Sequence, residues 1–450
     1  MNILSLNKKE YLILFAGDVI LLYCALWLTL AIRYGALPTK ELLSNHLTPF
    51  SLLFAVWVLI FFIAGLYEKH TLILKSRLPS VILNTQIINS VIAVLFFYFI
   101  PYFGITPKTN LFLYLLISFA LILAWRILGV PALGFRKKQK AILIGSGEEM
   151  RELRDEVNGN PRYNLMFASS IDLNQLEGVD FEDEILNTIY GENISTIVID
   201  LKNEKVEPIL PRLYNLIFSK IKFIDKYKVY EDIFDRVPLS LVGYNWFLEN
   251  VSSSSHIAYD FLKRLMDIMI ALVLGVLSFM LYPFVYAAIK LDDGGPLFFI
   301  ARRVGRNNKE IHLIKFRSMA VESQGGGIEE APHITRVGSL LRKTRIDELP
   351  QLWNVLKGDI SLVGPRPETP ELVTLYEKEI PYYDVRHLIK PGLSGWAQMY
   401  HKEHPHHGPD VEETRRKLSY DLYYIKNRSV LLDLKIALKT LKTLLSQGGR

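Results

Sequence analysis

Cationic side chains gather around one pair of neighbouring carboxylates, Asp347 and Glu348. The cations in this stretch are Lys315, Arg317, Arg336, Arg342, Lys343, Arg345 and Arg366. Lys and Arg offset phosphate charge, and Arg can do so through two parallel hydrogen bonds. The pattern therefore predicts a phosphorylated substrate. The side chains expected to bind its phosphates are Lys315, Arg317, Arg342, Arg345 and Arg366.

A carboxylate inside such a shell is expected to have a lowered pKa and to stay ionised. An ionised Asp347 beside bound phosphates is a candidate nucleophile that forms an acyl phosphate. Both carboxylates precede Leu349-Pro350, and proline is tolerated in the first turn of a helix. We expect the pair at a helix start, pointing apart, so that one attacks while the other orients a metal or handles protons. A surface helix start with ordinary ion pairs is the alternative.

Three further motifs contain residue types that could bind phosphate or a metal. The GPRP turn at Gly364–Pro367 is rigid and is expected to hold Arg366 in a fixed direction. The Gly325–Gly327 run lacks the strand, Lys-Ser/Thr and helix context of a phosphate-binding loop, which favours a mobile loop. A Pro/Gly-rich setting favours a solvated loop over a metal site for His401, His404, His406 and His407.

The composition indicates an integral membrane protein of two or three domains. Half of the 450 residues are hydrophobic, and the mean hydropathy is +0.20 with a pI near 9.0. The net charge of +6 favours an anionic lipid surface and phosphorylated substrates. Nucleic acid is disfavoured because no aromatic-studded basic groove or finger motif is present. The single cysteine excludes an intrachain disulfide, and no cleavable signal is expected.

Residues 1–135 are predicted to form a four-helix transmembrane domain. Each apolar run has about the length needed to cross a bilayer, ~20 residues. Positive charge concentrates before the first run, between the second and third, and after the fourth. The positive-inside rule therefore places both ends of this domain in the cytoplasm. The apolar runs are approximately Tyr11–Ile32, Phe50–Tyr67, Val81–Phe103 and Leu111–Val130, and the basic flanks include Lys8, Lys9, Lys69, Lys75, Arg77, Arg136, Lys137, Lys138 and Lys140.

Residues 139–250 are predicted to form a Rossmann-like α/β domain. AILIGSGEEMRELRDEV reads as a buried strand, a glycine turn and an amphipathic helix, and STIVIDL and IKFIDKYKVYEDI read as further strands. The dinucleotide fingerprint is incomplete, since Met150 follows Gly145 and Gly147 where a third glycine is needed, and Glu148 and Glu149 would repel a pyrophosphate. A structural or regulatory role is favoured over a working NAD site. Ser252–Ser255 reads as a flexible linker.

Residues 256–450 are predicted to combine a re-entrant membrane helix with a mainly α catalytic domain. The apolar core at about Ile268 to Ile289 is long enough to span, yet basic residues flank both of its ends and Pro283 interrupts it. We therefore favour a hairpin that enters and leaves by one face over a true span. Near the C-terminus, a leucine face and a lysine face predict either a helix at a membrane surface or one packed on its own domain.

The last 190 or so residues closely resemble the bacterial sugar transferase family, the monotopic polyprenol-phosphate sugar-1-phosphate transferases. The matching blocks are KRLMDI, GPLFFIARRVG, KFRSM, RVGSLLRKTRIDELPQLWNVLKGDISLVGPRPE, KPGLSGWAQ and YDLYYIKNRSVLLDLKI. The preceding domains resemble long-form members that initiate exopolysaccharide or O-antigen assembly. The family usually has a Ser-Pro break near the middle of its membrane helix, whereas Pro283 lies nearer the end here.

The resemblance implies transfer of sugar-1-phosphate from a nucleotide-diphosphate sugar, usually a UDP-sugar, to undecaprenyl phosphate. It also implies Asp347 as nucleophile, Glu348 as its partner, and Mg²⁺ near both carboxylates. Lys315, Arg342 and Arg366 fall on the family's functional basic positions. The implied location is the bacterial inner membrane, with the catalytic domain on the cytoplasmic face.

Two other functions remain open on the sequence. A membrane-anchored NAD-dependent nucleotide-sugar dehydratase needs an intact glycine loop and a Tyr-xxx-Lys pair, and Tyr259/Lys263 and Tyr286/Lys290 have that spacing beside the membrane segment. An inactive membrane scaffold is the non-enzymatic alternative. A homodimer assembled through the α/β domain is a further hypothesis.

Overall fold

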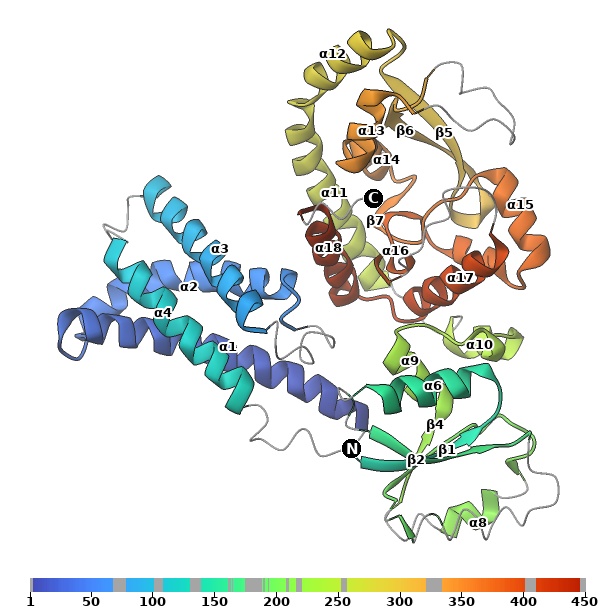
Figure 1. Ribbon diagram of the computed structural model, residues 1–450. Helices are drawn as coiled ribbons and strands as arrows, with labels where there is room; N and C mark the ends of the chain where they lie inside the picture. Colours follow the sequence, from blue (N-terminus) through green and yellow to red (C-terminus); the bar gives the residue numbers. More distant parts are fainter. Residues whose placement is uncertain are drawn as a thin grey trace. The chain divides into compact units, whose positions relative to one another are not determined.

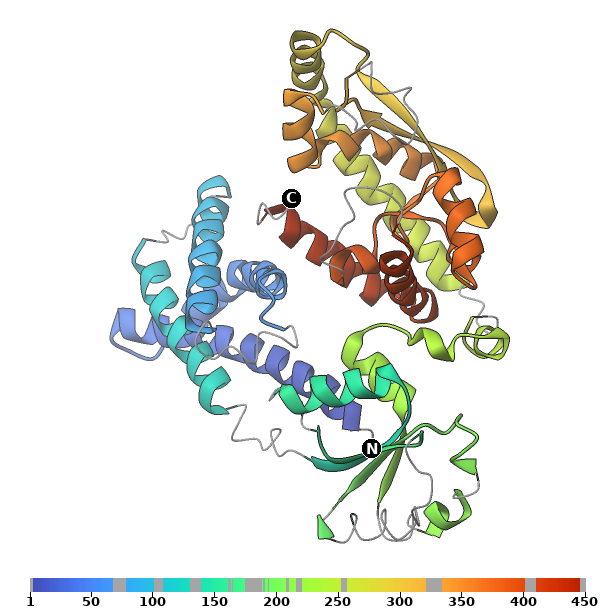
Figure 2. The ribbon, with the colours of Figure 1, turned by 45° about the vertical axis from the view of Figure 1, so that its right-hand side comes forward.

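The computed structural model divides into two compact units, Met1–Ile233 and Phe234–Arg450 (Figures 1 and 2). It describes residues 3–67, 78–100, 108–129, 139–160, 163, 165–174, 188, 191–192, 194–207, 210–215, 221–251, 257–320, 334–400 and 410–445. The basic flanks Lys69, Lys75, Arg77, Arg136, Lys137 and Lys138 and the Ser252–Ser255 linker lie outside the described residues.

The first unit begins with a bundle of apolar helices. Four of them are long and apolar enough to cross a membrane, which confirms the prediction of four helices of membrane-spanning length. The second begins well before Phe50, because Thr39 caps it by accepting a hydrogen bond from Leu42 N (3.3 Å) and Pro49 is accommodated inside it. The helices are α1 (Ile3–Tyr34), α2 (Lys40–Ile63), α3 (Leu78–Phe99) and α4 (Lys108–Ala124), the last continued by a π-helical turn, Trp125–Gly129.

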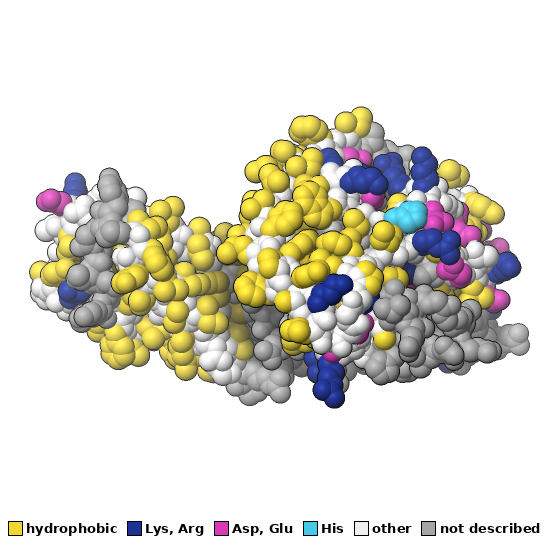
Figure 3. All heavy atoms as spheres, turned by 90° about the horizontal axis from the view of Figure 1, so that it is seen from above, with side chains coloured by type: hydrophobic (Ala, Val, Ile, Leu, Met, Phe, Trp, Pro, Cys, Tyr) yellow, Lys and Arg dark blue, Asp and Glu magenta, His cyan; other side chains and the backbone are white. Residues whose placement is uncertain are grey.

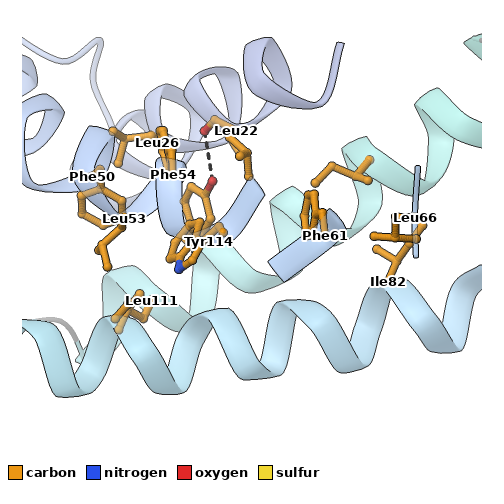
Figure 4. Close-up of a cluster of buried hydrophobic side chains, with 14 of the residues drawn as sticks. Leu22, Leu26, Phe50, Leu53, Phe54, Phe61, Leu66, Ile82, Leu111 and Tyr114 are labelled. Carbon is orange, nitrogen blue, oxygen red and sulfur yellow. Dashed lines mark hydrogen bonds between the residues drawn. The ribbon is translucent and has the colours of Figure 1, made fainter. Parts of the chain in front are cut away.

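Aromatic rings fill the centre of this bundle (Figure 4). Tyr114 lies among Phe50, Phe54 and Trp57, and its hydroxyl donates to Leu22 O (3.1 Å). Many Leu, Ile and Val side chains on the outer faces are exposed, as expected for helices surrounded by lipid tails. The bundle therefore has a packed aromatic core and an apolar exterior.

A parallel four-stranded sheet follows, with strand order β2-β1-β3-β4. Helices α6 and α9 lie on one side of this sheet and α8 on the other (Figure 1). The predicted first strand, helix and STIVIDL strand are confirmed, whereas most of IKFIDKYKVYEDI is helix. The elements are β1 (Gln139–Gly145), α6 (Glu148–Gly159), β2 (Leu165–Asp172), β3 (Thr196–Ile199), α8 (Leu210–Asn215), β4 (Lys222–Asp225) and α9 (Lys226–Phe234).

The glycine turn after β1 is closed by a side chain of the same domain. A Cβ added at Gly145 would meet Lys226 Cδ at 3.1 Å, and Lys226 Nζ forms a buried ion pair with Asp200 Oδ2 at 2.8 Å. Helix α6 begins directly after Gly147, which has φ +87, and Met150 is buried beneath it. The carboxyl edge of the strands, where open α/β sheets bind ligands, therefore carries a buried Lys–Asp pair.

The second unit is mainly helical with two small two-stranded sheets. Some residues that precede residue 256, the predicted start of the catalytic domain, belong to the core of this unit. Val237 and Trp246 are buried there with Trp396, and Trp396 Nε1 donates to Asp235 O (2.7 Å). The elements are α10 (Tyr244–Asn250), α11 (Ile257–Phe279), α12 (Tyr282–Asp292), β5 (Phe298–Val304), β6 (Glu310–Phe316), α13 (Arg336–Lys343), a 3-10 helix η8 (Ile346–Gln351), α14 (Leu352–Lys357), β7 (Ser361–Val363), α15 (Pro370–Glu379), η9 (Tyr383–Leu388), β8 (Gly392–Ser394), α16 (Trp396–Tyr400), α17 (Val411–Lys426) and α18 (Val430–Leu445).

Helices α11 and α12 form a bent apolar pair. The bend is 55°, and α11 ends at Phe279, the residue whose carbonyl the ring of Pro283 would otherwise meet. Leu272, Val276 and Phe284 are among the exposed apolar side chains of the pair. Seen from above, Figure 3 shows hydrophobic side chains gathered on the side of the second unit that α11 and α12 occupy in Figure 1.

The last helix, α18, packs on its own domain and still presents leucines outward. Ile436 is completely buried, and Lys435 and Lys439 lie over the rings of Trp396 and Tyr400. Leu431 on the other side is 79% exposed. The alternative in which this helix packs on its own domain is therefore confirmed for one face, and placement of the exposed apolar face at a membrane surface stays a prediction.

Candidate active site

The two carboxylates lie in the first turn of η8, as predicted. Helix α13 ends at Lys343, and Arg345 takes the left-handed conformation (φ 57) that turns the chain into η8. The α-helix proper begins only at Leu352, so Pro350 interrupts no α-helical hydrogen bond. The Asp-Glu-Leu-Pro sequence therefore favours the position of Asp347 and Glu348 in the first turn of η8.

Glu348 is surrounded by cations from three parts of the chain. Its Oε1 lies 3.2 Å from Lys315 Nζ and 3.5 Å from Arg366 Nη2, and its Oε2 lies 3.6 Å from Arg345 Nη1. Burial alone would raise the pKa of Glu348, but the charges of Arg366, Lys315 and Arg345 outweigh it and lower the pKa to about 2. Glu348 is therefore ionised at any physiological pH.

Asp347 has a different environment from its neighbour. It is 7% exposed, and among the described residues no donor reaches its Oδ1. Burial and the adjacent Glu348 charge raise the pKa of Asp347, against the smaller effects of Lys315, Arg342 and Arg345. The predicted lowering of the pKa is confirmed for Glu348 and wrong for Asp347, because the cations make their close contacts with Glu348.

Strand β6 brings Lys315 to the pair. Asn354 on α14 ties this strand to η8 and α14, since its Oδ1 accepts from Ile314 N (3.0 Å) and its Nδ2 donates to His312 O (2.7 Å). Burial lowers the pKa of Lys315, opposed by the Glu348 charge. The sequence marked Lys315 by its charge but gave no sign that Asn354 holds its strand.

Arg303 on β5 is a member of the cationic shell that the sequence analysis did not select. Its pKa is lowered by burial, and the charges that act on it include those of Glu368, Arg366 and Glu348. Val304 N donates to Glu368 O (2.9 Å), which joins the end of β5 to the GPRP segment. The alternation of side chains along a strand could have identified Arg303 from the sequence. It directs Arg302 outward to Glu371 (3.3 Å) and Arg303 inward.

The GPRP turn is held from behind by a buried network. Arg386 Nη2 donates to Arg366 O (3.0 Å) and pairs with Asp421 Oδ2 (2.9 Å). A Cβ at Gly364 would meet Lys390 O at 2.5 Å, so only glycine allows this close approach. The predicted rigidity of the turn has its physical cause in these contacts, and Arg386 was not identified from the sequence.

Of the two remaining predicted phosphate ligands, only Arg342 faces the carboxylates. Arg342 Nε donates to Ser318 Oγ (3.0 Å), and its charge lowers the pKa of Asp347. Arg317 is 2% exposed and instead forms an ion pair with Asp293 beneath Gly295, where a Cβ would overlap its guanidinium. In the described part of the chain, Arg317 is thus directed away from the carboxylate pair.

Possible metal ligands are few. No group of three or more His, Cys, Asp or Glu side chains that could hold an ion occurs within the described ranges. The four clustered histidines, His401, His404, His406 and His407, lie outside those ranges, as does Gly325–Gly327. The candidate ligands are then the two carboxylates themselves.

Comparison with known proteins shows which family has this sequence around the two carboxylates. The family model described as "Bacterial sugar transferase" matches residues 258–447. An exopolysaccharide production protein of Rhizobium leguminosarum is 40% identical over 197 residues, which are 42% of this chain and 96% of that protein. The chain belongs to the bacterial sugar transferase family. The match contains Asp347, Glu348 and every member of the cationic shell.

The matches to two other sugar transferase relatives cover only part of each protein. The N-acetylgalactosaminephosphotransferase of Aeromonas hydrophila that uses UDP-N-acetylgalactosamine and undecaprenyl phosphate is 45% identical over 195 residues, 42% of this chain and 45% of that protein. An undecaprenyl-phosphate glucose phosphotransferase of Komagataeibacter xylinus is 29% identical over 331 residues, 70% of this chain and 61% of that protein. The match to the Aeromonas protein thus spans less than half of its length.

The two Tyr-xxx-Lys pairs that a nucleotide-sugar dehydratase would need both lie outside the sheet domain. Tyr259 and Lys263 lie on α11 in the sugar transferase unit, where both contact Asp433 (2.9 and 2.7 Å). Tyr286 and Lys290 lie on α12 of the same unit. Neither Tyr-xxx-Lys pair belongs to the unit that contains the parallel sheet, so neither is built as that enzyme class requires.

Proposed function

We propose that this protein transfers sugar-1-phosphate from a nucleotide-diphosphate sugar, of the UDP class, to undecaprenyl phosphate. This step would initiate assembly of an exopolysaccharide, O-antigen or capsule glycan. The observation that carries the proposal is the Asp347 carboxylate: one oxygen is buried with no donor among the described residues, beside a glutamate that three cations keep ionised. The names of the Aeromonas and Komagataeibacter relatives support the acceptor.

In the proposed mechanism, an Asp347 oxygen attacks the sugar-linked phosphorus of the donor. The bond from that phosphorus to the oxygen bridging the two phosphates breaks, and the nucleoside monophosphate leaves with the electron pair. An oxygen of undecaprenyl phosphate then attacks the same phosphorus and releases Asp347. Each displacement builds negative charge on phosphate oxygens, which Lys315, Arg342, Arg345 and Arg366 are placed to offset.

Glu348 in this mechanism keeps the shell in place. Its ion pairs with Lys315, Arg345 and Arg366 draw side chains from β6, the α13–η8 turn and the GPRP turn to one point. A donor diphosphate that approaches Asp347 therefore meets cations that are already oriented. Such preorganisation costs no rearrangement at the moment of reaction.

The residues fit a magnesium ion. Mg²⁺ is commonly held by one or two carboxylates together with substrate phosphates, and Asp347 Oδ1 is a buried oxygen without a donor. Asp347 would supply one ligand, and Glu348 is the adjacent carboxylate. When bound, the ion would neutralise charge on the diphosphate.

We further propose that α11 and α12 form a re-entrant helix pair on the cytoplasmic face of the inner membrane. Exposed apolar side chains on both helices support membrane insertion, and the bend at Pro283 supports a return to the same side. This arrangement would bring the acceptor's phosphate, at the headgroup level, to the domain that carries Asp347.

The α/β sheet domain is proposed to be Rossmann-like and to serve homodimer assembly instead of NAD chemistry. The buried Lys226–Asp200 pair at its strand edge supports a structural role. Deleting residues 139–233, which leaves the core around Trp246 intact, should convert a dimer to a monomer in mild detergent. A monomeric full-length protein would sink this part of the proposal.

The test of function is a transfer assay in detergent with a panel of UDP-sugars and undecaprenyl phosphate. Wild type should release UMP and form lipid-linked sugar from one donor, and Asp347→Asn should lower the rate by at least about 10³-fold. Glu310→Gln, an exposed carboxylate on β6, is the matched control and should retain activity. Transfer that survives Asp347→Asn would overturn the nucleophile, and transfer from no donor would favour an inactive scaffold.

A further inference from the structure

A second cluster of cations lines a cavity of about 240 Å³ in the sugar transferase unit. The cavity shares no lining residue with the shell around Glu348. Its cationic members come from the first turns of α11, the β5–β6 turn, the segment before β8 and the connection between α17 and α18. We call it the Lys390 cavity, after its central cation; the cationic lining residues are Lys263, Arg264, Arg306, Lys390 and Arg428.

The lining carries excess positive charge. Two of its cations have carboxylate partners, since Lys263 pairs with Asp433 (2.7 Å) and Arg428 approaches Asp260 (3.9 Å). Asp267, the other acid of the lining, accepts a hydrogen bond from Leu362 N (3.1 Å). The remaining cations are not neutralised by these acids at ion-pair distance.

Arg264 and Lys390 converge at the floor of the cavity. Arg264 donates to the carbonyl oxygens of Val355 and Leu356 (2.6 Å each), which fixes the guanidinium without cancelling its charge. A Cβ at Gly358, which has φ +94, would lie 3.3 Å from Lys390 Nζ and 3.4 Å from Arg264 Nη2. The two cationic groups are therefore close neighbours around one backbone position.

Lys390 and Arg306 are the cations with capacity to bind a ligand. Among the described residues, no carboxylate oxygen lies within 4.0 Å of either side chain. Burial and the positive charge of Arg264 lower the pKa of Lys390, and Arg306 repels it as well, while the charges of Asp267 and Asp359 act in the opposite direction. An anion in the cavity would relieve this repulsion.

The position of the cavity on α11 suits a phosphate group near a membrane. Lys263 and Arg264 are followed within one turn by the exposed apolar side chains of Leu265 and Ile268. Basic pockets at the polar ends of apolar helices are suited to lipid head groups. The cavity also has room for several atoms, since a single water needs about 10–15 Å³ by the same measure of volume.

We infer that the Lys390 cavity is a second anion site, which binds a phosphate group through Arg264, Arg306 and Lys390. The phosphate is carried by an anionic lipid head group or is soluble, and the chemistry of recognition is the same. This site is separate from Asp347, and its occupancy does not depend on the proposed transfer reaction.

The test uses the full chain in phosphatidylcholine nanodiscs. One arm measures binding of radiolabelled inorganic phosphate by equilibrium dialysis. The other adds a small fraction of photoreactive phosphatidylglycerol and quantifies its crosslinks to peptides that contain Arg264 or Lys390. A Lys315→Met/Arg366→Gln variant removes the share of phosphate that the candidate active site binds, so the two sites are measured apart.

Lys390→Met/Arg306→Gln should weaken binding in one of the arms by about tenfold or more. The control is Lys378→Met/Arg416→Gln, which removes the same charge at exposed positions outside the cavity. Lys390→Arg should keep binding, which separates loss of charge from loss of fold. The arm that weakens identifies the source of the phosphate. Wild-type protein that binds in neither arm, or a cavity variant that binds like wild type in both, would overturn the inference.

Discussion

Asp347 and Glu348 are adjacent in sequence but opposite in electrostatics. Three cations contact Glu348 and lower its pKa to about 2, whereas burial and the Glu348 charge raise the pKa of Asp347. Pairs of titratable groups whose pKa values are pushed apart commonly divide catalytic roles. In the proposed mechanism, Glu348 is a permanent anion that organises the shell, and the protonation of Asp347 controls the reaction.

The first prediction concerns pH. A protonated Asp347 cannot attack phosphorus, so kcat should fall as pH falls through the raised pKa of Asp347. Glu348→Gln removes the neighbouring charge that raises this pKa, so the acid limb of the profile should move to lower pH while the rate drops by about 10²-fold. A kcat–pH profile of both proteins measures this. An acid limb that stays in place or moves upward would contradict the assignment.

The second prediction separates two arginines that look alike in the sequence. Arg345 contacts Glu348 at 3.6 Å and is partly exposed, so Arg345→Ala should raise the KM for the donor about tenfold and leave the melting temperature nearly unchanged. Arg317→Ala breaks a buried ion pair with Asp293 and should destabilise the unit by about 3 kcal/mol. Donor kinetics and thermal unfolding distinguish the two. A stable Arg317→Ala with a raised KM would restore Arg317 as a phosphate ligand.

At this scale the sequence predicts the position of the carboxylate pair better than the membership of the shell. Charge clustering and the Asp-Glu-Leu-Pro sequence are sufficient to place the carboxylates at a helix start. They do not show that Arg303 points inward from β5, that Arg317 is buried under Gly295, or that Arg386 holds the backbone of Arg366. Those features depend on which strand faces and loops meet in the fold.

At the scale of elements, the α11–α12 pair is the feature most directly tied to the membrane. Its bend follows from Pro283, the second residue of α12, which lies one turn after the end of α11. A continuous span would place the two ends of the pair on opposite sides of the bilayer. A re-entrant pair returns both ends to the side of the catalytic residues.

The third prediction tests this topology. In a Cys24→Ser background, single cysteines at Ile257 and Leu291, which are 76% and 88% exposed, mark the two ends of the pair. Both should react with a membrane-impermeant maleimide in inside-out vesicles and be protected in right-side-out vesicles. A cysteine at Glu41, in the first turn of α2, serves as the opposite-side control. Labelling of the 257 and 291 positions from opposite sides would contradict the re-entrant proposal.

Periodicity predicts some elements of this chain well and misses others for clear reasons. The four apolar helices and strand β1 stand out by composition. Strand β2 was missed because Ser169 and Ser170 interrupt its apolar pattern, and a register shift after Ala141 breaks the pairing on its partner. The sequence predicts a strand after Asp225, but this segment folds as α9, in which the Tyr230 hydroxyl donates to Glu152 of α6 (2.6 Å).

At the scale of the whole molecule, the candidate site is contained in one unit. Every residue assigned to it lies within Phe234–Arg450, and the Rhizobium relative consists almost entirely of the matching region. The membrane bundle and the sheet domain contribute no side chain to the site as proposed. They are expected to set location and assembly instead of chemistry.

The fourth prediction follows from this division. Residues 234–450 in detergent should transfer sugar-1-phosphate with a kcat within about tenfold of the full chain. Residues 257–450 lack Val237 and Trp246, which are buried in the core, and should be less stable by about 3–5 kcal/mol. Transfer rates and thermal unfolding of the two fragments measure this. Loss of activity in a folded 234–450 fragment would show that the first unit takes part in catalysis.

The central claim is that Asp347 carries the sugar phosphate during the reaction. The most direct measurement incubates the full chain with the active UDP-sugar and Mg²⁺, without undecaprenyl phosphate, and then sequences the labelled peptide by mass spectrometry. A sugar-phosphate mass is expected on Asp347; it should be absent from Asp347→Asn and lost when undecaprenyl phosphate is added. A transfer-competent enzyme that shows no adduct, or an adduct on another residue, would contradict it.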